Sequence, residues 1–315
     1  MNQAITLRQL RYLVALADTL HFGRAAEAAH VSQPSLSAQI QQLEDALGAR
    51  LLERTKRRVL LTPAGTAAVA RARRILGEIQ DLADGVRSAS RPLSADLRLG
   101  VIPTVGPYLL PRVLPALRQA HPDLRLYLRE DQTSRLLDRL RSAELDVTVL
   151  AMPVDDPAVT CEPLYDEDFL VALPPSHVLA ERGQLTEGDL ADERLLLLED
   201  GHCLRDQALA VCRYANTGDR DSFAATSLDT IREMVASRIG ITLLPALSVT
   251  GASAPNGGIV VRPFAPPAPS RRIALVWRRD AAREAEFRIL AGFLRDHLPP
   301  GDARPVAPAR GRSRD

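Results

Sequence analysis

Apolar residues recur every three or four positions through most of the first ninety residues, which is the period of an amphipathic helix. Thr6 can cap a first helix that extends to about Asp18. A short alanine-rich helix is predicted over residues 24–29, and a third over residues 35–47, ended by Gly48. Because only a short turn separates the last two helices, the pattern predicts a helix-turn-helix.

The pattern changes to short β-like runs at residues 51–54 and 59–61, which predict a small hairpin. Its tip is the basic run Thr-Lys-Arg-Arg at residues 55–58. A basic hairpin beside a recognition helix is typical of a winged helix-turn-helix, whose wing meets DNA phosphates. The alternative is a small structural helical domain with a solvated basic loop. Thr62 and Pro63 then open a long helix with one narrow apolar stripe, which is typical of a dimerising linker.

From residue 97 onward, predicted strands and helices alternate, which favours an α/β domain with parallel sheets. The first set comprises strands at 97–102, 124–128 and 147–150 and helices at 108–120 and 133–143. The second set comprises strands at 169–173, 195–198, 241–244, 259–261 and 272–277 and helices that start at 203, 228 and 281. Two such sets predict a two-lobed, periplasmic-binding-protein-like domain, in which ligands sit in the crevice at the strand ends.

We therefore predict four parts for the chain. Residues 1–61 form a winged helix-turn-helix DNA-binding domain, and residues 62–92 form a linker helix for dimerisation. Residues 93–298 form the two-lobed α/β regulatory domain. Residues 299–315, rich in Pro, Arg and Gly, are predicted to be a disordered tail.

Charge is distributed unevenly. Residues 1–90 hold 12 of the 40 Lys and Arg residues but only 8 of the 39 Asp and Glu residues. A basic head on a mildly acidic body favours a nucleic-acid-binding segment. The chain has no run of about eighteen uncharged apolar residues, and its first residues lack the apolar core of a secretory signal, so we expect a cytoplasmic protein without a membrane span.

DNA contacts are expected from the exposed face of the third helix, its turn, the first helix and the hairpin tip. Gln can pair with an adenine edge, Ser with any base, and Arg or Lys with phosphates. The candidates are Arg8, Ser32, Gln33, Pro34, Ser35, Ser37, Gln41, Lys56, Arg57 and Arg58.

Two of the three cysteines, Cys203 and Cys212, lie nine residues apart in a run without Gly or Pro that predicts a helix. Residues nine apart in a helix point to opposite sides and are about 13 Å apart along the axis. A disulfide needs Cα atoms within about 7 Å, so these sulfurs can join only if the helix unwinds. That property describes a redox switch. The alternative is that two buried cysteines share a helix incidentally, as we expect for a buried Cys161 after a strand.

Several runs resemble a known family. Residues 25–37, AAEAAHVSQPSLS, and the later Leu43-Glu44 and Leu47-Gly48 resemble the LysR-type winged helix-turn-helix. The body resembles the peroxide-responsive members of that family in GVIPTVGPYLLP at 100–111, LEDGHCLRDQ at 198–207 and GITLLPAL at 240–247. The resemblance covers about residues 7 to 298.

The resemblance implies a transcriptional regulator of oxidative-stress genes and not an enzyme. Hydrogen peroxide would oxidise Cys203 to a sulfenic acid, and Cys212 would resolve it as a disulfide that rearranges the regulatory domain. Residues that hold peroxide or tune the thiol are implied at Thr104, Thr133, His202, Arg205, Asp206 and Arg271.

Simpler roles stay open for some of these residues. Thr104 is also a turn residue beside a proline, Thr133 a helix cap, and His202 a structural residue. Arg272 adjoins Arg271, and a slip of one residue would exchange the two.

The resemblance further implies three partners: double-stranded DNA, further copies of the chain in a dimer or tetramer, and RNA polymerase. It implies hydrogen peroxide as the signal, and no metal or cofactor. Three alternatives stay open: a LysR-type regulator with an organic effector, a thiol peroxidase, and a solute-binding protein. The missing Cys-x-x-Cys motif and the DNA-binding pattern argue against the peroxidase. The missing signal sequence and the extra head argue against the solute-binding protein.

Overall fold

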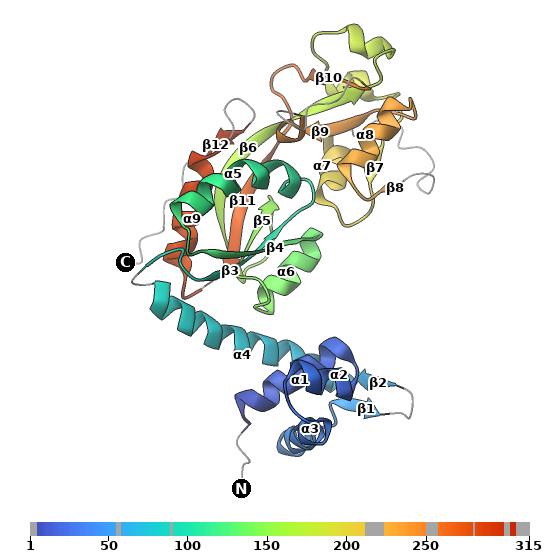
Figure 1. Cartoon of the computed structure of the whole chain (residues 1–315). Helices are drawn as coiled ribbons and strands as arrows, with labels where there is room; N and C mark the ends of the chain where they lie inside the picture. Colours follow the sequence, from blue (N-terminus) through green and yellow to red (C-terminus); the bar gives the residue numbers. More distant parts are fainter. Residues whose placement is uncertain are drawn as a thin grey trace. The chain divides into compact units, whose positions relative to one another are not determined.

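The computed structural model describes residues 5–54, 58–88, 91–211, 224–249, 258–279, 281–298 and 303–306. The chain divides into two compact units, Met1–Val86 with Arg139–Glu144 and Arg87–Asp138 with Leu145–Asp315. Each unit is described separately. The elements of both are labelled along the chain in Figure 1.

The first unit contains a winged helix-turn-helix. It comprises α1 (Leu7–Thr19), α2 (Phe22–Ala28), α3 (Gln33–Leu47), β1 (Leu52–Arg54), β2 (Val59–Leu61) and α4 (Pro63–Ser88). Thr6 caps α1 as predicted, in a reciprocal capping box with Gln9. Helix α3 begins two residues earlier than predicted because Ser32 is its cap. Buried residues of α1, α2 and α3 form one core.

The wing is fixed to the helices by backbone contacts. Strands β1 and β2 pair antiparallel, as predicted. The buried Glu44 accepts the backbone N–H groups of Leu51 and Leu52 at 2.8 and 3.2 Å, and so holds the chain where it enters β1. Thr62 caps α4 by accepting the N–H of Gly65 at 2.9 Å. Gly65 needs to be glycine because a Cβ there would lie 1.9 Å from the Leu51 carbonyl oxygen.

Two apolar side chains near the end of α4 are exposed. Leu82 is 66% exposed and Val86 is 70% exposed. Such a pair on a long helix fits a face that a second helix would cover. The role of α4 in dimerisation stays a prediction.

The second unit is built on a mixed sheet. Its strands are β3 (Asp96–Val101), β4 (Arg125–Glu130), β5 (Val147–Ala151), β6 (Val159–Leu173), β7 (Leu197–Leu198), β8 (Ala224–Ala225), β9 (Thr242–Pro245), β10 (Val260–Pro263), β11 (Ser270–Arg278) and β12 (Arg304–Pro305). Its α-helices are α5 (Gly106–Ala120), α6 (Thr133–Arg141), α7 (Cys203–Val211), α8 (Leu228–Ala236) and α9 (Glu284–Asp296), with 3-10 turns η1 (Val178–Glu181), η2 (Glu187–Leu190) and η3 (Ala246–Val249). The two α/β lobes are those predicted.

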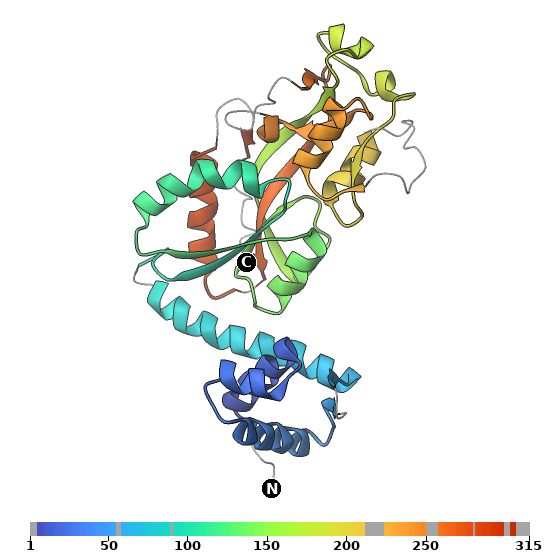
Figure 2. The same cartoon turned by 45° about the vertical axis from the view of Figure 1, so that its right-hand side comes forward.

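The parallel sheet predicted for the first set of strands is confirmed, but the sheet as a whole is mixed. Strand β3 is parallel to β4 and β5, but β11 pairs antiparallel with both β5 and β6. Strand β6 also pairs antiparallel with β9 and β10. The long strands β6 and β11 therefore run from the lobe of β3–β5 into the lobe of α7 and α8, as Figure 2 shows from a second side. These two strands connect the two lobes.

Two further expectations need correction. Residues 303–306 lie in the tail predicted to be disordered, but they contain β12, which pairs with β6, and Arg304 forms an ion pair with Asp168. Cys161 lies within β6 and is half-buried, whereas a buried position after a strand was expected. Among the described residues, no helix is long and apolar enough to cross a membrane.

Candidate redox site at the start of helix α7

Cys203 is the first residue of α7, and its thiol is free and partly buried. The preceding loop depends on Gly201, whose φ of +95° disfavours any residue with a Cβ. A Cβ there would also lie 2.7 Å from Gln132 Oε1. The prediction of a helix is confirmed for Cys203–Val211, while Cys212 lies outside the described residues.

The electrostatic balance at Cys203 differs from the expected one. We expected the helix terminus and nearby arginines to favour the thiolate. The Arg271 charge, the Thr133 hydroxyl and the backbone N–H groups of Cys203 and Leu204 do lower the pKa of this thiol. Burial acts in the opposite direction and is the larger effect, so the net pKa of Cys203 is raised.

Thr133 begins α6, and its hydroxyl lies near the Cys203 thiol. Thr133 Oγ1 is buried and has no regular hydrogen-bond partner among the described residues, so it does not act as a helix cap. It lies close enough to Cys203 to lower the pKa of the thiol. A buried hydroxyl without a regular partner, next to a reactive group, is suited to binding a small polar molecule.

Arg271 joins the site to the turn after β3. Its Nε donates to Glu167 Oε1 at 2.9 Å, its Nη1 to Thr104 Oγ1 at 2.9 Å, and its Nη2 to the Thr104 carbonyl at 3.0 Å. Thr104, Glu167 and Arg271 are all buried. Arg272 points the other way along β11, where it pairs with Asp166 and is exposed. Of the two arginines, Arg271 is therefore the one that faces the site.

His202 and the loop before it lie beside Cys203. The His202 ring is buried, and its Nε2 lies 3.7 Å from Glu199 Oε1, which is too long for a hydrogen bond. Gln132 donates to Glu199 Oε1 at 3.4 Å and to the Asp200 carbonyl at 3.3 Å. These bonds tie the loop of one lobe to the start of α6 in the other.

Two predicted site residues point elsewhere. Arg205 pairs with Asp200 at 2.8 Å and donates to the Leu198 carbonyl at 3.1 Å, and it does not contribute to the pKa shift of Cys203. Asp206 is exposed on the outer side of α7. Thr133, Arg271 and, through Arg271, Thr104 are brought together with Cys203.

Sequence reasoning missed two buried polar side chains near this site. Gln207 lies one turn after Cys203 and donates to the Met152 carbonyl at 3.5 Å, and its buried Oε1 has no hydrogen-bond partner among the residues that the structure describes. The i, i+4 spacing from Cys203 was a usable signal for Gln207. Glu167 carried no signal, because it sits in an acidic run that is typical of a surface.

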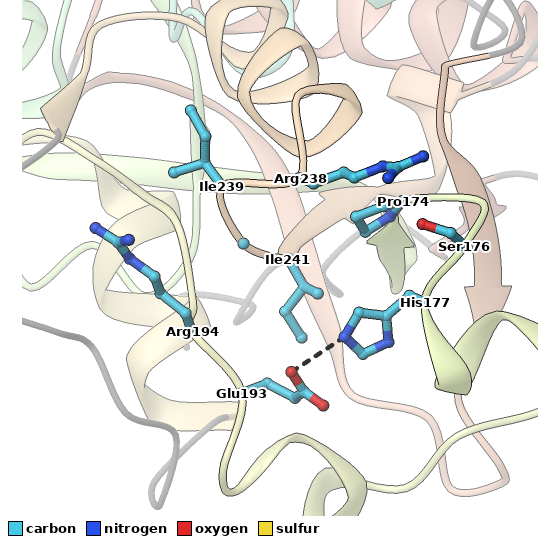
Figure 3. Close-up of a pocket in the computed structure, with 9 residues that line it drawn as sticks. Pro174, Ser176, His177, Glu193, Arg194, Arg238, Ile239 and Ile241 are labelled. Atoms are coloured by element: carbon cyan, nitrogen blue, oxygen red, sulfur yellow. Dashed lines mark hydrogen bonds and ion pairs between the residues drawn. The ribbon is translucent and has the colours of Figure 1, made fainter.

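A separate pocket of about 280 Å³ lies in the lobe of α7 and α8 (Figure 3). Inside it His177 Nε2 lies 3.1 Å from Glu193 Oε2, and the Ile241 side chain lies above that pair. No predicted site residue lines this pocket. Within the described ranges, no group of three His, Cys, Asp or Glu residues could hold a metal ion.

The candidate DNA-contacting residues are mostly exposed. Arg8, Ser32, Gln33, Pro34, Ser35, Gln41 and Arg58 are exposed, and Ser37 is half-buried. Ser32 also caps α3, and Gln41 donates to Asp45 at 3.0 Å. Lys56 and Arg57 lie outside the described residues.

Known proteins match both units. Residues 7–66 match the family described as bacterial regulatory helix-turn-helix protein, lysR family, and residues 90–299 match the LysR substrate binding domain. The hydrogen peroxide-inducible genes activator of Pectobacterium carotovorum subsp. carotovorum is 47% identical over 294 residues, which cover 93% of this chain and 97% of that protein.

Solved structures agree with these matches. A full-length OxyR from Pseudomonas aeruginosa with one cysteine-to-aspartate substitution is 40% identical with a TM-score of 0.76, and the match covers 93% of this chain and 95% of that one. A hydrogen-peroxide-bound OxyR mutant from Corynebacterium glutamicum is 36% identical with a TM-score of 0.65, covering 94% of each chain.

Proposed function

Since the chain belongs to the LysR family of bacterial helix-turn-helix regulators, we propose that it is a peroxide-responsive transcriptional regulator switched by Cys203. In this proposal the Cys203 thiolate attacks one oxygen of hydrogen peroxide, the O–O bond breaks, and the leaving oxygen departs as water after taking a proton. The sulfur is oxidised to a sulfenic acid. The Cys212 thiol then displaces the sulfenic oxygen as a second water and forms the disulfide.

The juxtaposition of Cys203, Thr133 and Arg271 is the observation that carries this proposal. Hydrogen peroxide both donates and accepts hydrogen bonds, and the Thr133 hydroxyl beside the thiol lacks a regular partner. Thr104 Oγ1 accepts from Arg271, so its own O–H is available to donate. His202 is the remaining buried polar side chain next to Cys203.

We infer that the switch acts by refolding α7. Helix α7 extends over Cys203–Val211, and a disulfide from its first residue to Cys212 is incompatible with helical geometry. The segment would be helical when reduced and rearranged when bridged. Arg205 and Asp206, at the start of α7, would tune the switch through the segment that rearranges.

The output in this proposal is altered DNA binding. Residues 1–61 would bind double-stranded DNA, residues 62–92 would dimerise, and residues 93–298 would sense peroxide. The protein would work as an activator, in a dimer or tetramer that also contacts RNA polymerase, in the cytoplasm where the chromosome lies. Base and phosphate contacts are proposed for the ten residues named above, Arg8 to Arg58.

Mapping the thiols by mass spectrometry before and after stoichiometric peroxide tests the proposal. The expected product is a disulfide between Cys203 and Cys212, with Cys161 unchanged. In the Cys212→Ser variant the sulfenic acid at Cys203 should persist and the mobility shift on a non-reducing gel should disappear.

A second experiment measures DNA binding by the Cys203→Ser variant. This variant should keep its affinity for operator DNA and lose the peroxide-induced change in binding. An unaltered peroxide response would refute the role of Cys203. Sustained peroxide turnover with a thiol reductant would favour a peroxidase instead.

A further inference from the structure

Beyond the residues already assigned to the redox site, Glu167 is buried on β6 with its side chain fully enclosed. Its Oε1 accepts from Arg271 Nε at 2.9 Å. Its other oxygen, Oε2, accepts the N–H of Leu247 in η3 at 3.1 Å. One carboxylate thus fixes Arg271 and also anchors the turn that follows β9.

Arg271 has the same enclosed setting, with its side chain 1% exposed. A guanidinium removed from water is stable only when a counter-charge and hydrogen bonds compensate it. Glu167 supplies that charge, and Thr104 supplies the two other acceptors. Removing the Glu167 charge would leave the full positive charge of Arg271 acting on its surroundings, which include Cys203.

We infer that Glu167 is a positioning residue for the Cys203 site: it holds Arg271 against Thr104, offsets the guanidinium charge, and thereby limits the reactivity of the resting thiol. The inference rests on the proposed function for its biological meaning, but its physical content concerns the thiol alone.

The other charged and titratable groups around this network are few. Near Glu167, the Tyr165 hydroxyl is buried and has no hydrogen-bond partner in the described ranges of the chain. Burial, followed by the Glu167 charge, raises the pKa of that phenol well above its usual value. Arg112 acts on the same phenol. On the Cys203 side, His202 lies next to Cys203, with Glu130 and Glu199 near the His202 ring.

The test is the pH profile of iodoacetamide alkylation at Cys203, read by mass spectrometry of its peptide in the full chain. Glu167→Gln should move the midpoint about one pH unit lower and raise the rate at pH 7 about tenfold, since an unbalanced cation near a thiol favours the thiolate. In the Arg271→Gln background the same substitution should have no such effect. This dependence shows that Glu167 acts through Arg271.

Glu162→Gln is the matched control. Glu162 is also buried on β6 and pairs with two arginines, Arg288 and Arg295, at 2.9 and 3.0 Å, but these belong to α9. This variant should remove the charge of a buried carboxylate that pairs with two partly exposed arginines, and leave the Cys203 profile unchanged.

A Glu167→Gln profile that stays at the wild-type midpoint or moves to higher pH, with the circular dichroism spectrum retained, would overturn the inference. If that variant does not fold, Glu167→Asp serves instead, because it keeps the charge but shortens the reach to Arg271. Glu167→Asp should move the midpoint of the Cys203 profile to lower pH by less than is expected of Glu167→Gln. An unchanged midpoint in this variant would also overturn the inference. Alkylation needs neither peroxide nor Cys212, so failure here is distinct from failure of the proposed switch.

Discussion

Thr133 provides a test in which stability and reactivity should change in opposite directions. Its Oγ1 is buried without a regular partner in the described part of the chain, and it lies beside the Cys203 thiol. Thr133→Val replaces the hydroxyl with a methyl group of similar volume and leaves the start of α6 otherwise unchanged. The substitution therefore isolates the hydroxyl.

The stability effect follows from the missing partner. A buried polar group without a hydrogen bond costs about 1–3 kcal/mol, so removing the Thr133 hydroxyl should raise the free energy of unfolding by about 1 kcal/mol. For a unit of this size that corresponds to a rise in Tm of about 2–4 °C. A natural protein that retains such a cost at a reactive centre retains it for function.

The reactivity effect has the opposite sign. The Thr133 hydroxyl lowers the pKa of Cys203, and in the thiolate that forms during the reaction it would donate a hydrogen bond to a charged group, which contributes about 1.5–3 kcal/mol. Without it the pKa of the thiol rises further, and the second-order rate of sulfenic acid formation at pH 7 should fall at least about tenfold. Stopped-flow mixing with peroxide measures the rate, and a thermal melt measures the stability.

Thr148→Val is the matched control on β5. Thr148 is fully buried, but its hydroxyl donates to the Val276 carbonyl at 3.3 Å. Its loss should reduce stability by about 1 kcal/mol and leave the peroxide rate unchanged. The reasoning fails if Thr133→Val behaves like this control, with lower stability and a wild-type rate.

Three further outcomes are expected. Because burial raises the pKa of Cys203, its alkylation rate should keep rising with pH beyond the range where ordinary thiols level off, and a plateau near pH 7 would contradict this. Glu44→Ala leaves the buried N–H groups of Leu51 and Leu52, where the chain enters β1, without this acceptor, so the first unit should lose at least about 2 kcal/mol in a denaturant titration and lose DNA affinity with it. Gly65→Ala should destabilise the first unit by about 1–3 kcal/mol because the new Cβ meets the Leu51 carbonyl, whereas Gly292→Ala in α9, where nothing lies within 4 Å, should stabilise by about 0.5–1 kcal/mol in the same thermal melt.

Local patterns predicted the first unit well because its elements are specified by neighbouring residues. The Thr6 cap, the Ser32-Gln33-Pro34 turn and the Thr62 cap each act within three or four positions. The antiparallel course of β6 could not be predicted in this way. It contains Pro163 and, at its middle, the acidic run at 166–168, which interrupt the period of a strand, and its partner β11 lies about a hundred residues later.

The residues of the candidate site also differ in how far local sequence could identify them. Cys203 and His202 were identified from one contiguous run, and Thr104, Thr133 and Arg271 from resemblance. Their convergence depends on pairings such as Arg271 with Thr104, 167 residues apart in sequence. Glu167 could not be found from sequence, because its enclosed position depends on the pairing of β11 with β6, which places Arg271 opposite Glu167 and which no local pattern specifies.

The raised pKa of Cys203 changes how its reactivity must be explained. Burial favours the protonated form of this thiol, so the proposed reaction needs groups that favour the thiolate at the moment of attack. We infer that the rate comes from hydrogen-bond donors that position peroxide and stabilise the departing oxygen: Thr104, whose hydroxyl is oriented by Arg271, together with Thr133 and His202. Only an oxidant small enough to reach all three, and able to both donate and accept hydrogen bonds, gains from that arrangement. In this proposal disulfides and bulky peroxides gain nothing from these donors, and a preference for hydrogen peroxide would follow from the partly buried position of the thiol, which also raises its pKa.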